Sequence, residues 1–570
     1  MRKKLALSIS LLLLAVSGNC LAFGADSQAK EKAVSQDIVL RAMSDEMERT
    51  MKSLKLPDYP LPYFASYSVV DDELNQVSAS FGAISTRANY KSRQPEVCVR
   101  VGDKHIDNTF FSPSYLGLGG DSFSLDDDYD AIRYGLWQQS DKVYKHAVES
   151  LQSVKSRLKL IKIEDAPDCF SDASPTVTLE EPAKNNTDMD KWSDIVRRVS
   201  AVFRDYPELK DSSCQLNSRS RTTRFLNSEG TVTRLGETGT LFSLSASAQA
   251  KDGMELSDNQ VFASDTAAGL PDEAALADAA RALAQRVIAL TKAKPAEDYQ
   301  GPILFEKEAA AQILASTIAP KLCARPEAGR LGGREERKLD KPLLAPSISV
   351  VDDPTVKTFN GEALKSGWHV DYEGVPAQKL TLVDKGLLKV VCSTRTPSSL
   401  SKASNGHNRG GLPSPGHLFL SSADKTSFDA LKQKLIDIGK EEKLDSVLIV
   451  RRSNISLGFD TGIIGILMHL GRGGSMSSPC MAYKLDVKSA KEELIRGARI
   501  SEPSKRSLLT MQAADDAHSY LVRYPTDRSS YTISAITPSL LFKDMEVAKP
   551  PQTTEVQPYL KNPYFEEQGK

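Results

Sequence analysis

Residues 214–249, CQLNSRSRTTRFLNSEGTVTRLGETGTLFSLSASAQ, decide the fold of the first half of the chain. Polar and apolar residues alternate on both sides of the turn Asn227-Ser228-Glu229-Gly230. Alternation with a period of two is typical of strands that bury one face, and a glycine at the end of a short turn suits positive φ angles. The stretch therefore predicts a β-hairpin.

The regions around this hairpin alternate between helical and strand patterns. Apolar residues that recur at steps of three to five predict helices near residues 38–54, 126–161, 190–203 and 272–293. Alternating β-branched and aromatic residues predict a strand meander over residues 63–111. The long helix at 126–161 is interpreted as a packing helix without chemistry of its own.

The second half of the chain opens with a strand and a helix over residues 301–322. Short strands follow near residues 347–351, 379–382, 387–392 and 446–451, with a helix near 427–439. With 570 residues the chain is several times longer than a typical ~150-residue domain. We therefore expect an α+β protein of two domains, residues 25–295 and 296–570, with strand meanders, long amphipathic helices and a β-rich C-terminal domain.

The first 24 residues have the pattern of a signal peptide. Three basic residues, Arg2, Lys3 and Lys4, precede an apolar run over 5–16 that is shorter than the ~20 residues needed to span a bilayer. Cys20 leaves a lipoprotein open, although the polar Asn19 before it fits a lipid-attachment site poorly. The pattern predicts a periplasmic or secreted protein with no integral membrane span, because the later apolar run 462–470 is also too short.

The charge balance argues against nucleic acid as a partner. Lys and Arg number 73 and Asp and Glu 74, so the net charge is -1 and supplies no basic field. Six cysteines remain after residue 24, too few for a disulfide-built scaffold. None of them lies near a histidine in zinc-ligand spacing. They are interpreted as buried apolar residues or as one or two isolated bridges.

Five segments, in order, resemble the TldD/PmbA family of bacterial proteins, described as modulators of DNA gyrase and as metallopeptidases. The segments are FLNSEGT (225–231), GPILFEKEAAAQIL (301–314), VDYEGVPAQKLTLVDKGLLKVVCSTRTPSSL (370–400), Asn405-Gly406-His407 and SAITPSLLFKDMEV (534–547). The resemblance runs over most of the chain after residue 24 and implies the family's two-domain fold.

The resemblance also implies a division between two types of member. TldD-type members carry His-Glu-x-x-x-His on the helix after the opening strand, and a later cysteine completes their metal site. The corresponding stretch here, residues 315–320 (ASTIAP), has no ligand, and Pro320 would disturb a helix. The chain therefore resembles the PmbA (TldE) type, whose implied partner is a TldD-type, metal-bearing paralogue. A homodimer remains an alternative.

A replacement metal site remains an alternative in the sequence. If residues 369–373 form a strand, His369, Asp371 and Glu373 point to one face and could share a cation. His407 lies in a glycine-rich loop with Asn405 and Gly406. We therefore take His369, Asn405, Gly406 and His407 as cleft candidates, and we expect no catalytic residue and no cofactor unless zinc binds at such a site.

Three functions compete at this point. The favoured hypothesis is an exported, metal-free subunit of a heterodimeric metallopeptidase, a pseudoenzyme that helps to hold a peptide substrate during proteolysis. The alternatives are an active metallopeptidase with non-standard ligands and a non-enzymatic binding or scaffold protein of the cell envelope. Because the His-Glu-x-x-x-His motif is absent, we do not expect catalysis by the chain alone.

Overall fold

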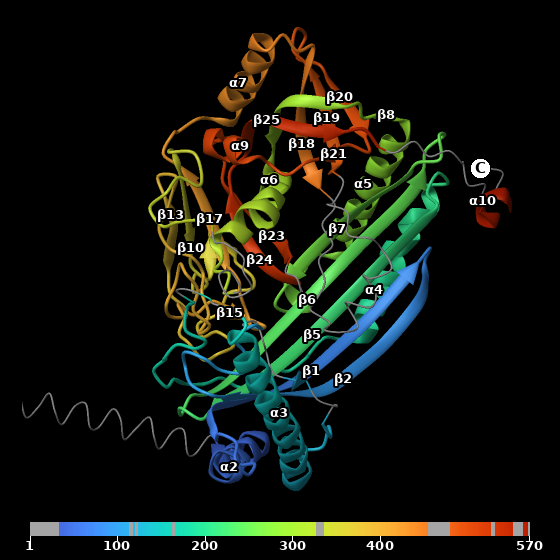
Figure 1. Cartoon of the computed structure of the whole chain (residues 1–570). Coiled ribbons are helices and arrows are strands. Elements are labelled where there is room, and N and C mark those ends of the chain that lie inside the picture. The colour runs from blue at the N-terminus through green and yellow to red at the C-terminus, as the bar shows by residue number, and fades with distance from the viewer. Residues whose placement is uncertain are drawn as a thin grey trace, which may run out of the picture.

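The computed structural model describes residues 34–112, 118–119, 123–161, 163, 166–326, 336–453, 479–525, 530–550 and 562–567. The expected signal peptide and the apolar run 462–470 lie outside these ranges. Helices and strands alternate along the chain, which confirms the α+β prediction (Figure 1). No helix within the described ranges is long and apolar enough to cross a membrane.

The first half of the chain forms a seven-stranded sheet in the order β3-β2-β1-β5-β6-β4, with β7 also paired to β6. The strands are β1 (Pro62–Ser80), β2 (Ala83–Val101), β3 (Leu118–Gly119), β4 (Val177–Leu179), β5 (Asp211–Asn227), β6 (Val232–Gln249) and β7 (Glu255–Ser264). The predicted hairpin is confirmed as β5 and β6, where Leu226 faces Val232 and Gly230 has a φ of 100°. The predicted meander over 63–111 is the β1–β2 pair.

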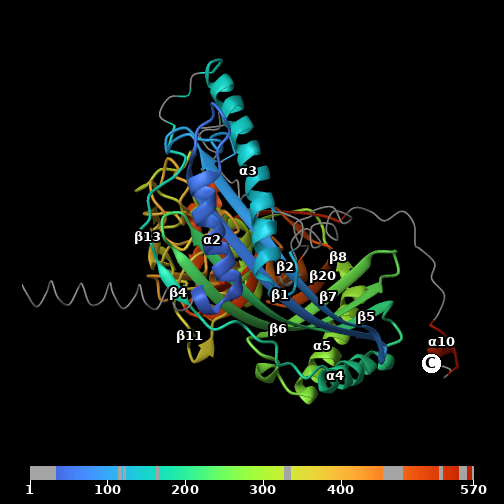
Figure 2. The ribbon, with the colours of Figure 1, turned by 90° about the horizontal axis from the view of Figure 1, so that it is seen from below.

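Four helices pack on this sheet at the predicted positions (Figures 1 and 2). They are α2 (Ile38–Ser53), α3 (Tyr129–Leu158), α4 (Met189–Ala201) and α5 (Glu273–Lys292), and an aspartate side chain caps the N-terminus of each. α2 and α3 share a core with Tyr67 and Val69 of β1, and α4 and α5 share a second core with Val77 of the same strand. Odd-numbered residues of β1 point to one face, so the four helices cover opposite ends of that face.

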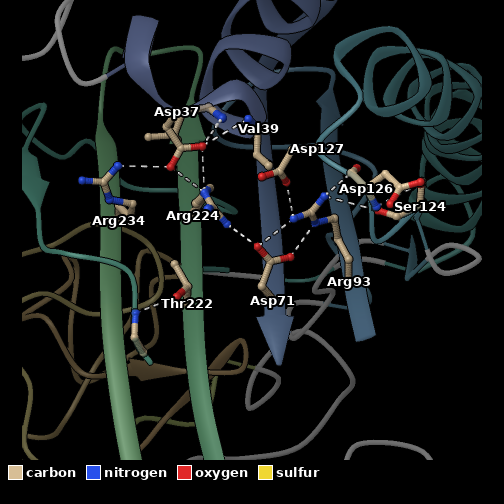
Figure 3. Close-up of polar contacts among 12 residues, drawn as sticks. Asp37, Val39, Asp71, Arg93, Ser124, Asp126, Asp127, Thr222, Arg224 and Arg234 are labelled. Carbon is tan, nitrogen blue, oxygen red and sulfur yellow. Dashed lines mark hydrogen bonds and ion pairs between the residues drawn. The ribbon is translucent and has the colours of Figure 1, made fainter. Parts of the chain in front are cut away.

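Between these two cores, the helix-covered face of the sheet carries charged side chains (Figure 3). Nε of Arg224 donates to the Asp37 carboxylate at 2.8 Å, and its Nη1 donates to Asp71 Oδ2 at 2.6 Å. Arg93 joins Asp71 to Asp127. Asp37 also caps α2 through the N–H groups of residues 39 and 40. This polar ladder therefore ties the first helix to the centre of the sheet.

The second half contains two sheets. The first has the order β21-β25-β9-β18-β19-β20-β8, with β22 paired to β25. Its strands are β8 (Lys294–Pro295), β9 (Tyr299–Phe305), β18 (Ser446–Ser453), β19 (Pro479–Asp486), β20 (Glu492–Arg496), β21 (Arg499–Ile500), β22 (Gln512–Ala513) and β25 (Leu540–Ala548).

The other sheet has the order β14-β13-β10-β17-β24-β23. Its strands are β10 (Ile348–Asp352), β13 (Leu380–Asp384), β14 (Leu387–Leu388), β17 (His417–Ser422), β23 (His518–Pro525) and β24 (Ser530–Thr537). Two small ribbons are formed by β11 (Thr358–Phe359) with β12 (Glu362–Ala363), and by β15 (Asn408–Arg409) with β16 (Leu412–Pro413). The remaining helices are α7 (Phe428–Glu441), α9 (Lys505–Thr510) and α10 (Pro563–Glu567).

α6 (Lys307–Ile313) follows β9 directly and shares one buried core with both sheets of the second half. The helix does not stay regular. It continues as a π-turn over Leu314–Ile318 and a 3₁₀ turn over Ala319–Leu322, where Pro320 stands in the first turn. Proline lacks a backbone N–H and clashes with the preceding turn, so the predicted disturbance at Pro320 is confirmed.

Three arginines of the second half reach into the first half. Arg395 forms two hydrogen bonds with the Glu229 carboxylate, Arg452 donates to the carbonyl oxygen of Asn259, and Arg496 contacts the Asp252 carboxylate. Each arginine therefore joins a different segment of the first half. Together they join the β5–β6 turn, the β6–β7 turn and β7 itself to the second half.

Candidate functional site

A pocket of about 340 Å³ lies between β7 and the second half of the chain. One wall is the β7 strand, including Val261 and Ala263. The opposite side includes Glu308 of α6, Tyr520 of β23 and the β11–β12 ribbon. We call this space the β7 groove. Its lining combines the β7 strand with side chains of α6, and in TldD-type members of the family that the sequence resembles, this helix carries the metal motif.

Within the part of the chain that the structure describes, β7 pairs with β6 alone, and its other edge is open along this groove. In antiparallel pairs, the N–H and C=O of a residue point to the same side, and the side alternates along the strand. Nη2 of Arg452 reaches the Asn259 carbonyl from outside the sheet, at 3.1 Å. By alternation, Val261 and Ala263 also turn their backbone N–H and C=O away from β6 and toward the groove. The groove therefore offers main-chain donors and acceptors at a spacing that suits an added strand.

Charges of both signs line the groove. Arg452 lies 3.4 Å from Glu308 Oε2 and also donates to the Gln260 side chain. Burial raises the pKa of Glu308, and Arg452 opposes that shift. Lys365 forms an ion pair with Asp265 at 2.8 Å. Neither sign dominates, so the lining suits a peptide better than a polyanion.

Among the described residues, no group of three ligand-type side chains lines this groove. α6 and the turns that follow it, residues 307–322, contain no histidine and no cysteine up to Leu322. The stretch 315–320, expected at the position of the metal motif, is mostly buried: Ala315, Thr317 and Ile318 point into the protein. The residues present on this helix do not fit the metal that the family implies.

The expected strand at His369–Glu373 is wrong, because these residues form a turn. Asp371 is buried and accepts hydrogen bonds from the N–H groups of residues 373, 375 and 408. Its carboxylate is therefore held by the turn itself, while His369 is exposed to solvent. The Glu373 side chain accepts the N–H of Arg395. The three residues do not form a ligand set.

Asn405, Gly406 and His407 are buried at a corner of the second half and do not line the β7 groove. The Asn405 side chain accepts the N–H of Ser393 and donates to the carbonyl of Val391, so it fastens two loops. His407 is completely buried. Burial acts to lower its pKa, but the hydrogen bond to the Asp352 carboxylate outweighs this and raises the pKa.

Gly406 permits this corner. Its φ is 77°, and a Cβ atom there would lie 2.2 Å from the carbonyl oxygen of Pro376. We expect Gly406→Ala to lower the free energy of unfolding by more than about 1 kcal/mol, because strained backbone and a steric clash add together. Urea unfolding followed by circular dichroism measures this. Gly361→Ala is the control: its φ is 83° with no atom within 4 Å of the added Cβ, so an equal loss would show that the contact with Pro376 contributes nothing.

The groove residues carry no recognisable sequence signal. The open edge at Val261 follows from the pairing of β7 with β6, and Arg452 and Glu308 look like ordinary surface charges in the sequence. Residues 471–478, which are also rich in glycine, lie outside the described residues. Of the elements that line the groove, only the helix with Glu308 could have been proposed from the sequence as part of a site, because it follows the opening strand.

Comparisons with known proteins show what this chain is similar to. Residues 298–452 match the model of the PmbA/TldA metallopeptidase C-terminal domain. No curated protein sequence matches the chain. Solved structures share its fold over nearly their whole length.

Three of these structures illustrate the likeness. TldE from Thermococcus kodakarensis is 14% identical with a TM-score of 0.52, over 89% of this chain and 100% of that one. A protein from Thermotoga maritima, described as a candidate modulator of a DNA gyrase, is 14% identical with a TM-score of 0.51 over 85% and 96%. Its counterpart from Bacteroides thetaiotaomicron is 9% identical with a TM-score of 0.53 over 89% and 98%. At these identities the likeness concerns the fold.

The fold and the site together define a two-part α+β protein with a metallopeptidase-type C-terminal domain whose α6 lacks the His-Glu-x-x-x-His motif. The domain match over residues 298–452 and the fold shared with TldE support a member of the TldD/PmbA family. The resemblance in the sequence is thereby confirmed.

Proposed function

We propose that this protein is an exported, metal-free subunit of a heterodimeric peptidase and that it holds an extended peptide along the β7 groove. The observation that carries the proposal is the open β7 edge beside an α6 helix without the His-Glu-x-x-x-His motif. Main-chain groups of Val261 and Ala263 would pair with the peptide, as in other cases of strand addition. Hydrolysis would be supplied by a TldD-type partner that carries the His-Glu-x-x-x-His motif.

The chemistry of the groove supports a binding role. Burial raises the pKa of the Tyr520 phenol, which therefore stays protonated and can donate a hydrogen bond. Glu308 is engaged by Arg452 at 3.4 Å. A nucleophile with an adjacent base, which catalysis without a metal would need, is not found among the described residues of the groove. The near-neutral net charge and the expected export give no support to an action on DNA.

Co-expression tests the proposal directly. The mature chain is produced with an exported paralogue that retains His-Glu-x-x-x-His, and the two are purified through a tag on one of them. We expect a stable complex with peptidase activity that neither chain shows alone. Activity of this chain alone would favour an enzyme with non-standard ligands. Absence of both a complex and a gain in activity would favour a scaffold protein.

Val261→Pro tests the strand-addition mode. Proline removes the N–H that faces the groove, and at an edge strand with an outward N–H it leaves the pairing with β6 intact. Loss of one main-chain hydrogen bond and the intruding ring should weaken peptide binding by the complex by about tenfold or more. Binding of a labelled peptide is measured by fluorescence anisotropy.

Val261→Ala is the matched control, since it shortens the side chain but keeps the N–H. We expect its peptide affinity to stay within about threefold of the unmodified complex. Circular dichroism and complex formation report on folding of both variants. Equal affinity of the proline and alanine variants in folded complexes would rule out pairing of the peptide with β7 at this residue.

A further inference from the structure

A second cluster of ligand-type residues lies in the second half, away from the β7 groove. Asp352, Cys392 and His407 each offer one donor atom, and these atoms all lie within 4.8 Å of one another. Asp352 ends β10, Cys392 follows β14, and His407 precedes β15, so three separate loops meet here. All three residues are buried with no measurable exposure, and none lines the groove.

The hydrogen bonds of His407 orient it as a ligand. Its Nδ1 lies 2.9 Å from the carbonyl oxygen of Asn405, and because a carbonyl only accepts, Nδ1 carries the proton. Its Nε2 therefore faces the cluster, 2.8 Å from Asp352 Oδ2. A backbone carbonyl that fixes the distal nitrogen is the usual support of a metal-bound imidazole. Nε2 needs either a second proton or a cation shared with the carboxylate.

Cys323 supplies a fourth candidate ligand. It pairs with Cys392 through an isolated parallel bridge, in which the N–H of Ala324 donates to the Cys392 carbonyl. The two thiols interact with each other, and Cys323 also acts electrostatically on His407. The Asp352 carboxylate, the Cys392 sulfur and the His407 nitrogen are ligand types that zinc accepts. The Cys323 sulfur lies beside Cys392 but outside this group of three, and it would complete a four-coordinate set.

The loops around the cluster indicate what a bound metal would stabilise. Residues 353–416 contain strands of only two to five residues, yet many of their polar side chains are buried. Among these buried polar residues are Ser393, Thr394, Asn405, Asn408 and Ser414. In a segment with so little regular structure, a bound metal would fasten the loops to one another.

We propose that Asp352, Cys392 and His407, with Cys323 as fourth ligand, bind one zinc ion in a closed structural site. Nε2 of His407 and the two sulfurs would bind as neutral imidazole and thiolates, with release of the thiol protons. The burial of all the ligands leaves no open position for water, so the site stabilises the loops and does not hydrolyse peptides. The site is independent of the proposed role of the β7 groove.

Metal analysis of the full mature chain tests this inference. The protein is purified without chelator, incubated with equimolar zinc, separated from unbound metal and analysed by mass spectrometry. We expect about one zinc per chain, and a lower Tm after removal of the metal by a chelator. Cys392→Ser and His407→Gln should lose the zinc. Cys214→Ser, another buried cysteine in the sheet of the first half, should keep it.

Cobalt binding to the unmodified chain tests the same site without variants that could fail to fold. In the unmodified chain, cobalt at this site should show the charge-transfer absorption of a thiolate ligand. Substoichiometric zinc in the folded chain, or cobalt without that absorption, would overturn the inference. The inference would also be overturned if the denatured, unreduced chain had two titratable thiols fewer than it has cysteines, because Cys323 and Cys392 would then form a disulfide. Zinc without peptidase activity would leave the proposed function of the groove unaffected.

Discussion

Replacement of Arg395 with methionine is expected to lower the free energy of unfolding by about 2–3 kcal/mol, because it removes a buried guanidinium that pairs with the partly exposed Glu229 and donates to the buried Ser171 carbonyl. Arg395 is 1% exposed. Its guanidinium forms two hydrogen bonds with Glu229, at 2.6 and 3.0 Å, and donates to the Ser171 carbonyl at 2.7 Å. It also lies over the ring of Phe170, 4.0 Å from the centroid.

The effect should concern the junction between the two halves. Glu229 lies in the β5–β6 turn and would lose its contact with the second half, whereas Ser171 would keep its hydrogen bonds to the backbone carbonyl of residue 395. Urea unfolding gives the free energy, and limited proteolysis of the folded variant reports on the opened junction. Arg395→Lys should recover only part of the loss, because lysine cannot form the two parallel hydrogen bonds.

A matched control separates this effect from the loss of any surface charge. Lys389 pairs with Asp340 in the same half, and both side chains are exposed. Lys389→Met should change the free energy of unfolding by no more than about 1 kcal/mol. If Arg395→Met behaves like this control, the contact with Glu229 does not hold the halves together.

Asp37→Asn is expected to cost about 3 kcal/mol in the first half, since it removes the carboxylate charge from the polar ladder. Asp37 is buried and contacts Arg224 and Arg234. Asparagine still caps α2, because it is as good an N-cap as aspartate. The loss would therefore measure the charge and not the cap, and urea unfolding again provides the value.

Comparison with an exposed pair tests the role of burial. Asp190 and Arg87 form an ion pair on the same half, with both side chains largely exposed. We expect Asp190→Asn to cost no more than about 1 kcal/mol. Equal losses for Asp37→Asn and Asp190→Asn would show that the buried position of Asp37 adds nothing.

The contribution of Asp37 should also depend on pH. Burial acts to raise its pKa, but the ion pair and hydrogen bond with Arg224, together with Arg234, lower the pKa below the ordinary 3.8. A carboxyl whose pKa is depressed on folding stabilises the protein above its unfolded pKa and loses this contribution as the pH falls through the folded pKa. The difference between the unmodified chain and Asp37→Asn should therefore shrink below about pH 4.

Local elements could be predicted because local chemistry determines them. The alternation over 214–249 and the glycine at residue 230 specify a hairpin wherever the chain places it. The helices predicted near 38–54 and 272–293 have apolar stripes and aspartate caps in the right places. The prediction failed at His369–Glu373, where Asp371 binds three backbone N–H groups and converts an apparent strand into a turn.

The sequence by itself determined the hairpin, the helices, the family resemblance and the lack of a His-Glu-x-x-x-His motif on α6, since each of these depends on residues close together in the chain. Only the tertiary structure decided the β7 groove and the cluster of Asp352, Cys392 and His407. An open strand edge exists only once β7 pairs with β6 on one side alone, and ligands 15 to 55 residues apart meet only after three loops have packed. Such sites leave no spacing pattern, because the contacts that create them connect distant parts of the chain.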